Sequence, residues 1–185
     1  MTPKGNAFIR SYGLFWRREE INWSPGHGNG KDFRLLGRRG KRYPKLEVAD
    51  FRDQLGIYVL HDDYGAYYVG LARDRSIAKR LKDHTKGTHK DNWDRFSWFG
   101  FRGVLSTCDA NGLRRLGKMP QTLLTDSRST IGDIEALLMV ALGTTKRGNT
   151  LTMKFKGAEQ WEQIAKDETQ AYYRLIRSPL HQEQA

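Results

Sequence analysis

The sequence has few of the residues that build disulfide frameworks, thiolate metal sites or membrane spans. Its 185 residues include a single cysteine, Cys108, which excludes an intramolecular disulfide and a cysteine-based zinc site and suits a reducing cytoplasm. The five histidines show no paired spacing of the kind that metal ligands use. No run approaches the roughly 18 apolar residues of a membrane span, and the first residues lack the apolar stretch of a secretory signal. We therefore expect a cytoplasmic protein without a membrane partner.

Acidic residues are also scarce relative to basic ones. The chain has 32 lysines and arginines against 21 aspartates and glutamates, which leaves a net charge of +11. This balance favours a polyanionic partner, with nucleic acid first, and a basic surface without such a partner is the plain alternative. Hydrophobic residues make up 38% of the chain and aromatic residues 11%, enough for a packed core. A length of 185 residues suits one domain with a modest appendage.

The first 50 residues differ in pattern from the rest. Short strand-like runs around a glycine-rich loop predict a β-rich basic extension over residues 1–50. A second unit is predicted over residues 51–178, followed by a loose tail at residues 179–185. The extension contains the densest cationic run of the chain, Arg38-Arg39-Gly40-Lys41-Arg42. We interpret Arg38, Arg39, Lys41 and Arg42 as phosphate contacts, and a solvated hairpin tip is the alternative.

Two short apolar runs flank an Asp/Gly turn and predict a β-hairpin at about residues 55–70. Because successive side chains of a strand alternate between faces, Tyr58 is expected opposite Val59. On the second arm Tyr68 and Gly70 should share one face, with Tyr67 on the other.

An amphipathic helix is predicted directly after the hairpin, at about residues 75–86, with Asp74 as its N-cap. Ile77 and Leu81 form its apolar stripe. At about 100° per residue, Arg80 and His84 lie beside this stripe and should sit at the edge of the core.

Further elements follow along the chain. An aromatic-rich strand is predicted from Trp93 to about Leu105. A strongly apolar helix at residues 131–142 carries Glu135, and a last amphipathic helix runs from about residue 158 to 176. Together these elements predict an α+β fold. The N-terminal β-rich extension would precede it.

Several of these residues are candidates for chemistry, each with a structural alternative. Glu135 lies among apolar residues, where a carboxylate is costly to bury unless it is paired or binds a metal; an exposed glutamate in the first helical turn is the alternative. Arg80 indicates either a buried ion pair or an anion site. Tyr58 and Tyr68 are also ordinary strand residues. Taken alone, these residues indicate a basic α+β domain with an anionic ligand.

The hairpin and the helix after it resemble the GIY-YIG nuclease family. The resemblance rests on Gly56-Ile57-Tyr58 and on Tyr68-Val69-Gly70, where valine replaces the usual isoleucine. The other matching positions are Arg80, His84, Glu135 and, more loosely, His89 and Asn149. The histidine at His84 makes the chain more similar to phage homing and restriction members than to the excision-repair nuclease. The resemblance covers residues 55–155. It implies a small GIY-YIG-like domain with a central antiparallel sheet of about three strands flanked by helices.

This resemblance implies a metal-dependent endonuclease that hydrolyses phosphodiester bonds. Tyr58 would act as general base on the attacking water, and Arg80 would stabilise the phosphate. Glu135 would bind one Mg²⁺ (or Mn²⁺) ion per active site. Tyr68 and His84 would complete the catalytic set. Arg80, the metal and a hydrogen bond from His84 or Tyr68 would have to lower the pKa of Tyr58. Further nucleic-acid contacts are predicted at Arg73, Lys79, His89 and Asn149.

We expect the substrate to be DNA, double-stranded in the first place, in a setting such as restriction or anti-phage defence. A mobile-element nuclease and a repair nuclease are alternatives. The alternative of a different class is a catalytically inactive nucleic-acid-binding module on the same fold. The presence of all five catalytic candidates argues against that module. Monomer and homodimer both stay open.

Overall fold

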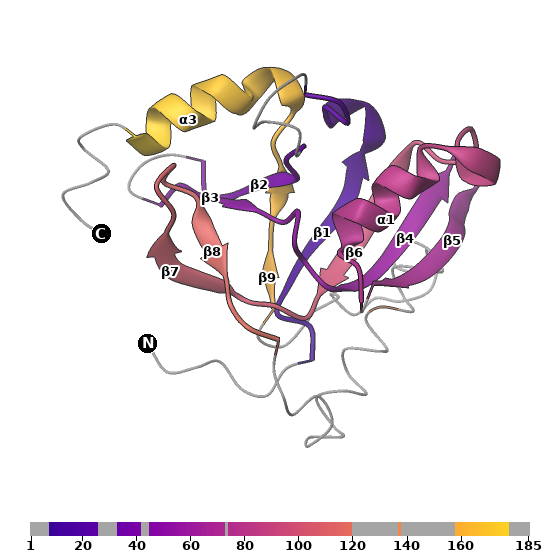
Figure 1. Cartoon of the computed structure of the whole chain (residues 1–185), viewed down its shortest axis with the longest axis horizontal. Coiled ribbons are helices and arrows are strands. Elements are labelled where there is room, and N and C mark those ends of the chain that lie inside the picture. The colour runs from indigo at the N-terminus through magenta and orange to yellow at the C-terminus, as the bar shows by residue number, and fades with distance from the viewer. Residues whose placement is uncertain are drawn as a thin grey trace, which may run out of the picture.

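The computed structural model describes residues 8–25, 33–41, 45–72, 74–119, 137 and 158–177. Over these residues the strands form two five-stranded sheets, and the helices α1 and α3 are short (Figure 1). The first sheet contains β1 (Ser11–Arg17), β4 (Gly56–Asp62), β5 (Gly65–Ala72), β6 (Arg95–Gly100) and β9 (Glu159–Gln160). The second contains β2 (Leu36–Arg39), β3 (Glu47–Asp50), β7 (Val104–Cys108), β8 (Arg114–Leu116) and β10 (Glu162–Gln163). The helices are α1 (Ile77–His84) and α3 (Thr169–Arg177), with short 3-10 turns η1 (Arg18–Glu20), η2 (Gly87–His89) and η4 (Lys166–Glu168).

The first sheet is built around the predicted hairpin. Its strand order is β5-β4-β6-β1-β9. The β4/β5 hairpin is antiparallel, with Tyr58 opposite Gly70, which confirms the predicted hairpin. Strand β6 pairs antiparallel with the other side of β4, and β1 pairs antiparallel with β6. The hairpin that carries the two tyrosines therefore forms one edge of a broader sheet.

The second sheet lies beside the first and is covered by α3 (Figure 1). Its strand order is β10-β2-β3-β8-β7. The amphipathic helix α3 buries Ile176 in an apolar cluster with Leu36, Val48 and Leu113 of this sheet region, and Tyr172 packs against the same cluster. Burial of this one helical face explains why a short helix is stable here.

One short segment joins the two sheets. Residues 159–160 pair with β1 in the first sheet, and residues 162–163 pair with β2 in the second. Between them the indole of Trp161 is almost fully buried in the main core, and its backbone carbonyl accepts a 3.2 Å hydrogen bond from Nε1 of Trp16. The switch of sheets at Trp161 ties the C-terminal part of the chain to β1.

The predicted fold class is wrong. The sequence predicts a sheet of about three strands flanked by helices, plus an N-terminal β-rich extension. Instead, there are two five-stranded sheets, and β1 from the first 50 residues lies inside the first sheet, between β6 and β9. The helix predicted from residue 158 begins only at Thr169, because Trp161 and its neighbours extend as strands into the core. Pairing between β1 and β6 joins residues 78 to 89 positions apart, which no local pattern reveals.

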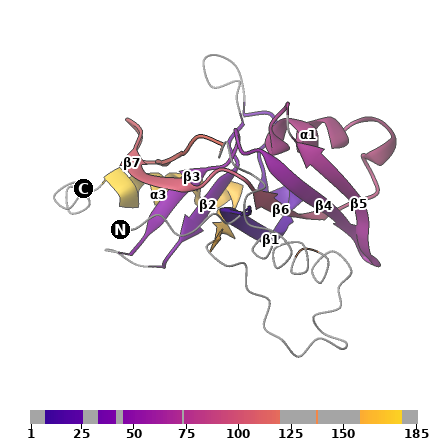
Figure 2. The same cartoon turned by 90° about the horizontal axis from the view of Figure 1, so that it is seen from below.

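The two faces of the first sheet carry separate cores, as the alternation in β4 predicts. Tyr58 and Leu60 lie in the main cluster with Trp98, whereas Val59 packs on the other face with Phe99. Helix α1 covers the Tyr58 face (Figure 2) and buries its residues Ile77, Ala78 and Leu81. Its N-cap is Ser76, whose Oγ accepts from the backbone N–H of Lys79, and not Asp74 as predicted. Among the described residues, neither α1 nor α3 is long and apolar enough to cross a membrane.

His61 is a buried histidine on the face of the first sheet opposite Tyr58, next to the strained residue Phe15 of β1. Phe15 adopts a left-handed backbone conformation at a bulge in β1, and its ring contacts His61 with centroids 4.9 Å apart. The hydroxyl of Ser97 accepts a 3.1 Å bond from the Phe15 N–H and lies 3.0 Å from Nε2 of His61. The Ser97 hydroxyl therefore links the β1 backbone to the imidazole of His61. Burial, the largest cause, lowers the pKa of His61 to about 4.

This histidine predicts a loss of stability in mild acid. Unfolded His61 takes up a proton near pH 6.5, whereas folded His61 does so only near pH 4. Stability present above pH 6.5 is therefore lost as the pH falls towards 4, by about 3 kcal/mol from this residue. Urea unfolding at pH 7 and pH 4 should show a smaller difference for His61→Gln than for the wild type. Equal differences would contradict the assignment, since other histidines contribute equally to both proteins.

Candidate active site

The predicted residues Tyr58 and His84 form a hydrogen-bonded pair. Tyr58 projects from the middle of β4, and His84 is the last residue of α1. The Tyr58 Oη lies 2.8 Å from Nε2 of His84. Burial and then the charge of His89 lower the pKa of His84, so its imidazole is neutral at neutral pH. Burial and then Tyr68 raise the pKa of Tyr58 well above its usual value of 10. The protonated phenol can donate to Nε2 of His84 when the neutral imidazole carries its own proton on Nδ1.

Two more predicted residues complete an aromatic group around this pair. The ring of Tyr68 lies 6.1 Å from that of Tyr58 and 5.1 Å from that of His84, measured between centroids. His89 from η2 lies 4.9 Å from His84 and 5.2 Å from Tyr68. Hairpin, helix and the loop after the helix thus bring four candidate residues together. Tyr68 is half-buried, and Tyr58 is only 2% exposed.

A bulge in the hairpin adds a residue that alternation had placed elsewhere. Leu60 pairs with Tyr68 and His61 with Ala66, so Tyr67 is an extra residue on β5. Such a bulge redirects side chains, and Tyr67 consequently joins the side of Tyr68. Its Oη lies 3.1 Å from Nδ1 of His89 and accepts a 3.2 Å bond from Asn92. The predicted opposite placement of Tyr67 is wrong, and period-2 reasoning offers no signal for the bulge.

Arg80 lies one helical turn before His84 and has no acidic partner among the described residues. Its side chain is half-buried, as predicted, and its Nε is buried with no hydrogen-bond partner among the described residues. Across the same part of the chain no carboxylate lies within ion-pairing distance of it. A buried guanidinium N–H without a partner is costly. An anionic partner at this position would remove that cost.

In the cationic run of the first 50 residues, Arg38 and Arg39 form ion pairs with glutamates of other strands. Arg38 pairs with Glu162 at 2.5 Å. Arg39 pairs with Glu47 and Glu159, and its guanidinium lies over the ring of Trp161 at 5.5 Å. These two arginines join β2 to neighbouring strands, so substituting them would also disturb the fold. Lys41 is exposed.

The remaining predicted site residues divide into two groups. Lys79 is exposed on α1, next to Arg80. Arg42, Arg73, Glu135 and Asn149 lie outside the described residues. The described residue nearest to Glu135 in the sequence is Leu137. It is helical and packs against the cluster of Val59 and Phe99. That cluster lies on the sheet face opposite Tyr58.

The described cluster alone does not suit a divalent metal. Around Tyr58 it supplies phenols, imidazoles and a guanidinium, whereas Mg²⁺ prefers carboxylate and water oxygens. Among the described residues no group of three or more His, Cys, Asp or Glu side chains is placed to hold a metal ion. A carboxylate ligand would have to come from another part of the chain, and Glu135 is the predicted one.

Gly70 fixes the position of the Tyr58 ring. A Cβ atom at Gly70 would overlap the phenol of Tyr58, so only glycine leaves space for it. Overpacking of this kind costs about 1–3 kcal/mol. We expect Gly70→Ala to lower the free energy of unfolding by about that amount in urea titration, because the ring must move. Gly103→Ala is the matched control, since its nearest neighbour would be 3.7 Å away. Equal stability of the two variants would contradict this packing.

Comparisons of the chain with protein-family profiles, curated proteins and solved structures find no match. Function must therefore be argued from the residues of this chain and their geometry.

Proposed function

We propose that this protein is a metal-dependent endonuclease that hydrolyses phosphodiester bonds in DNA, with its reaction centre at Tyr58, His84 and Arg80. The observation that carries the proposal is the 2.8 Å contact between Tyr58 and a neutral His84, one helical turn from an arginine without an acidic partner among the described residues. An acid/base pair beside a guanidinium that the described residues leave without a carboxylate suits attack of water on a phosphate. The net charge of +11 supports a nucleic-acid substrate.

Arg80 binds the scissile phosphate in this proposal. Its guanidinium offers N–H donors to the non-bridging oxygens and a charge that opposes the one developing in the transition state. Because the described residues give it no carboxylate, none of that charge is spent on a structural ion pair there. The exposed Lys79 contacts a neighbouring phosphate.

Tyr58 and His84 move the proton of the attacking water. The raised pKa of Tyr58 opposes a standing phenolate. We therefore assign a relay: Tyr58 Oη accepts the proton of the water while its own proton passes to Nε2 of His84. The geometry already aligns the second transfer at 2.8 Å. His84 must be neutral to accept it, and its lowered pKa meets this requirement at neutral pH.

In this proposal Glu135 is the residue that would bind the metal ion. An Mg²⁺ or Mn²⁺ ion bound there would supply Lewis-acid chemistry at the phosphate.

A nucleic-acid-binding module without catalysis is the second candidate. Tyr58 is only 2% exposed, which restricts access of water to its hydroxyl. Leu137 packs against Val59 and Phe99, on the sheet face opposite Tyr58. Under this alternative Arg80 binds phosphate, and the Tyr58–His84 pair is structural.

Cleavage assays distinguish the two candidates. Supercoiled plasmid and labelled oligonucleotides, as duplex DNA, single-stranded DNA and RNA, are incubated with the protein in Mg²⁺ or EDTA. We expect duplex cleavage in Mg²⁺, none in EDTA, and loss of cleavage in Glu135→Ala but not in the exposed control Glu168→Ala. Cleavage unchanged by EDTA and by Glu135→Ala would remove the metal. Binding without cleavage in Mg²⁺ and Mn²⁺ would favour the module.

A further inference from the structure

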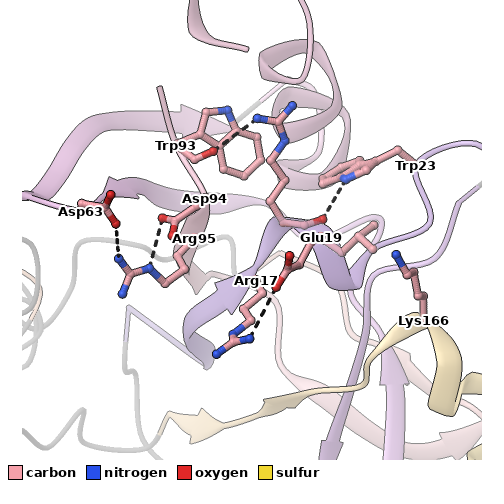
Figure 3. Close-up of a pocket in the computed structure, with 10 residues that line it drawn as sticks. Arg17, Glu19, Trp23, Asp63, Trp93, Asp94, Arg95 and Lys166 are labelled. Atoms are coloured by element: carbon pink, nitrogen blue, oxygen red, sulfur yellow. Dashed lines mark hydrogen bonds and ion pairs between the residues drawn. The ribbon is translucent and has the colours of Figure 1, made fainter. Parts of the chain in front are cut away.

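A separate pocket of about 800 Å³ opens at one end of the first sheet (Figure 3). It lies where β1 passes into η1, beside the start of β6 and the hairpin turn at Asp63. Its lining combines aromatic rings with side chains of both charges, and the described catalytic candidates Tyr58, Tyr68, Arg80 and His84 are not part of it. The volume suits a ligand of nucleotide size.

The centre of the pocket wall is a guanidinium stacked on an indole. The Arg18 Cζ lies 4.7 Å from the centre of the Trp93 ring. Its Nη1 donates to the backbone carbonyls of Lys90 and Trp93, the latter at 3.3 Å. Trp23 donates from Nε1 to the carbonyl of Arg18 at 3.0 Å, which holds the arginine backbone as well (Figure 3). Arg18 thus presents a fixed, flat and cationic surface to the pocket.

Two more cations at this pocket are available to an anion. Lys166 is exposed and has no ion-pair partner in the part of the chain that the structure describes. Among the described residues the guanidinium of Arg17 forms an ion pair with Glu19 at 3.5 Å, and both side chains are mostly exposed. Such a surface pair contributes little and separates easily. By contrast, Arg95 is held between Asp94 at 3.1 Å and Asp63 at 3.9 Å.

We propose that this pocket binds one unpaired nucleotide, with its base stacked on Arg18 and its phosphate at Lys166 and Arg17. Guanidinium planes and aromatic rings are the surfaces on which unpaired bases stack. The carboxylates of Glu19, Asp63 and Asp94 oppose a dense polyphosphate or duplex backbone. They also offer acceptors to base amino groups. One base with one phosphate fits this mixture of charges.

The pocket shares a segment with the candidate active site. Trp93 donates from its indole to the carbonyl of His84 at 3.1 Å, and Arg18 holds the loop that begins at η2 and carries His89. This inference rests on the proposed function, because the nucleotide in the pocket would be part of the DNA that the nuclease cleaves. DNA with an unpaired segment would then be a better substrate than continuous duplex.

Tryptophan fluorescence tests this proposal because the chain separates its five tryptophans into two groups. Trp23 and Trp93 line the pocket, whereas Trp16, Trp98 and Trp161 are at most 2% exposed in the core. Tyr58→Phe protein, which would bind without cleaving, is titrated with single-stranded oligothymidylate, a blunt duplex and thymidine monophosphate. We expect quenching by the single strand, and quenching by the monophosphate would identify free nucleotide as a ligand of the same chemistry.

Variants locate the binding. Arg18→Ala should weaken the affinity for the single strand about 10-fold. Lys166→Ala should reduce the salt dependence of this affinity by the equivalent of about one phosphate contact. Trp23→Phe should remove most of the quenching. Arg174→Ala, an exposed arginine of α3, is the control and should change nothing. Lys166 lies on the surface, so its variant stays informative if Arg18→Ala fails to fold.

The outcomes separate the pocket from the proposed function. No quenching by any probe, or equal quenching by blunt duplex, would overturn the pocket assignment. If the Arg18→Ala and Lys166→Ala variants then still cleave duplex DNA, the proposed function stands without the pocket assignment. Quenching with the expected variant pattern supports the pocket even if the wild type never cleaves.

Discussion

Replacing Arg80 by alanine is expected to lower the single-turnover rate of DNA cleavage by about 10²- to 10³-fold, the usual effect of removing one preorganised donor from a transition state. The reason is the missing counter-charge: the described residues offer Arg80 no acidic partner, and its Nε is buried without a hydrogen bond. Removal of this side chain should leave the fold intact, since a costly unpaired group disappears.

Two neighbouring substitutions make the Arg80 result specific. Lys79→Ala removes the adjacent exposed charge and should change the rate by only a few-fold, through weaker binding. Arg80→Lys keeps the charge but loses the planar fork of donors, so an intermediate rate is expected. Equal rates for Arg80→Ala and Lys79→Ala would reject the catalytic role of Arg80.

Replacing Tyr58 by phenylalanine is expected to lower the cleavage rate by about 10²- to 10⁴-fold, the range for loss of proton transfer by a positioned side chain. The variant deletes only the hydroxyl that contacts His84 at 2.8 Å. The ring remains against Gly70 and in the main core, so a folded protein is expected in circular dichroism. Affinity for DNA should be unchanged.

Controls for Tyr58 use the other tyrosines and His84. Tyr64 is 99% exposed at the hairpin turn, and Tyr64→Phe should cleave at the wild-type rate. His84→Gln removes the proton acceptor and should resemble Tyr58→Phe. The double variant should be little slower than either single variant, because the two residues act as one relay. Multiplying effects would instead indicate independent roles.

Local patterns in the sequence predicted the local part of this site. The Asp/Gly turn and the two apolar runs predicted the β4/β5 hairpin, and alternation correctly separated Tyr58 from Val59. Helical periodicity placed Arg80 and His84 at the edge of the core, where both are half-buried. Each inference depends on residues close in sequence, whose relation is fixed by backbone geometry.

The rest depended on contacts between distant residues. Pairing of β1 with β6 and the sheet switch at Trp161 decide the architecture, and each joins segments that local propensity cannot match. The bulge that brings Tyr67 to His89 breaks the period on which the prediction relied. Similarly, the cationic run gave no sign that Arg38 and Arg39 pair with carboxylates from other strands.

The most direct test of the Tyr58–His84–Arg80 centre is cleavage of supercoiled plasmid by the wild type and by the Tyr58→Phe/Arg80→Ala double variant, at matched DNA binding in Mg²⁺. We predict that the wild type converts the plasmid to nicked or linear form while the double variant leaves it supercoiled. Cleavage by the double variant at the wild-type rate would contradict the proposed centre. A wild type that binds the plasmid but never cuts it, in Mg²⁺ or Mn²⁺, would contradict the proposed activity.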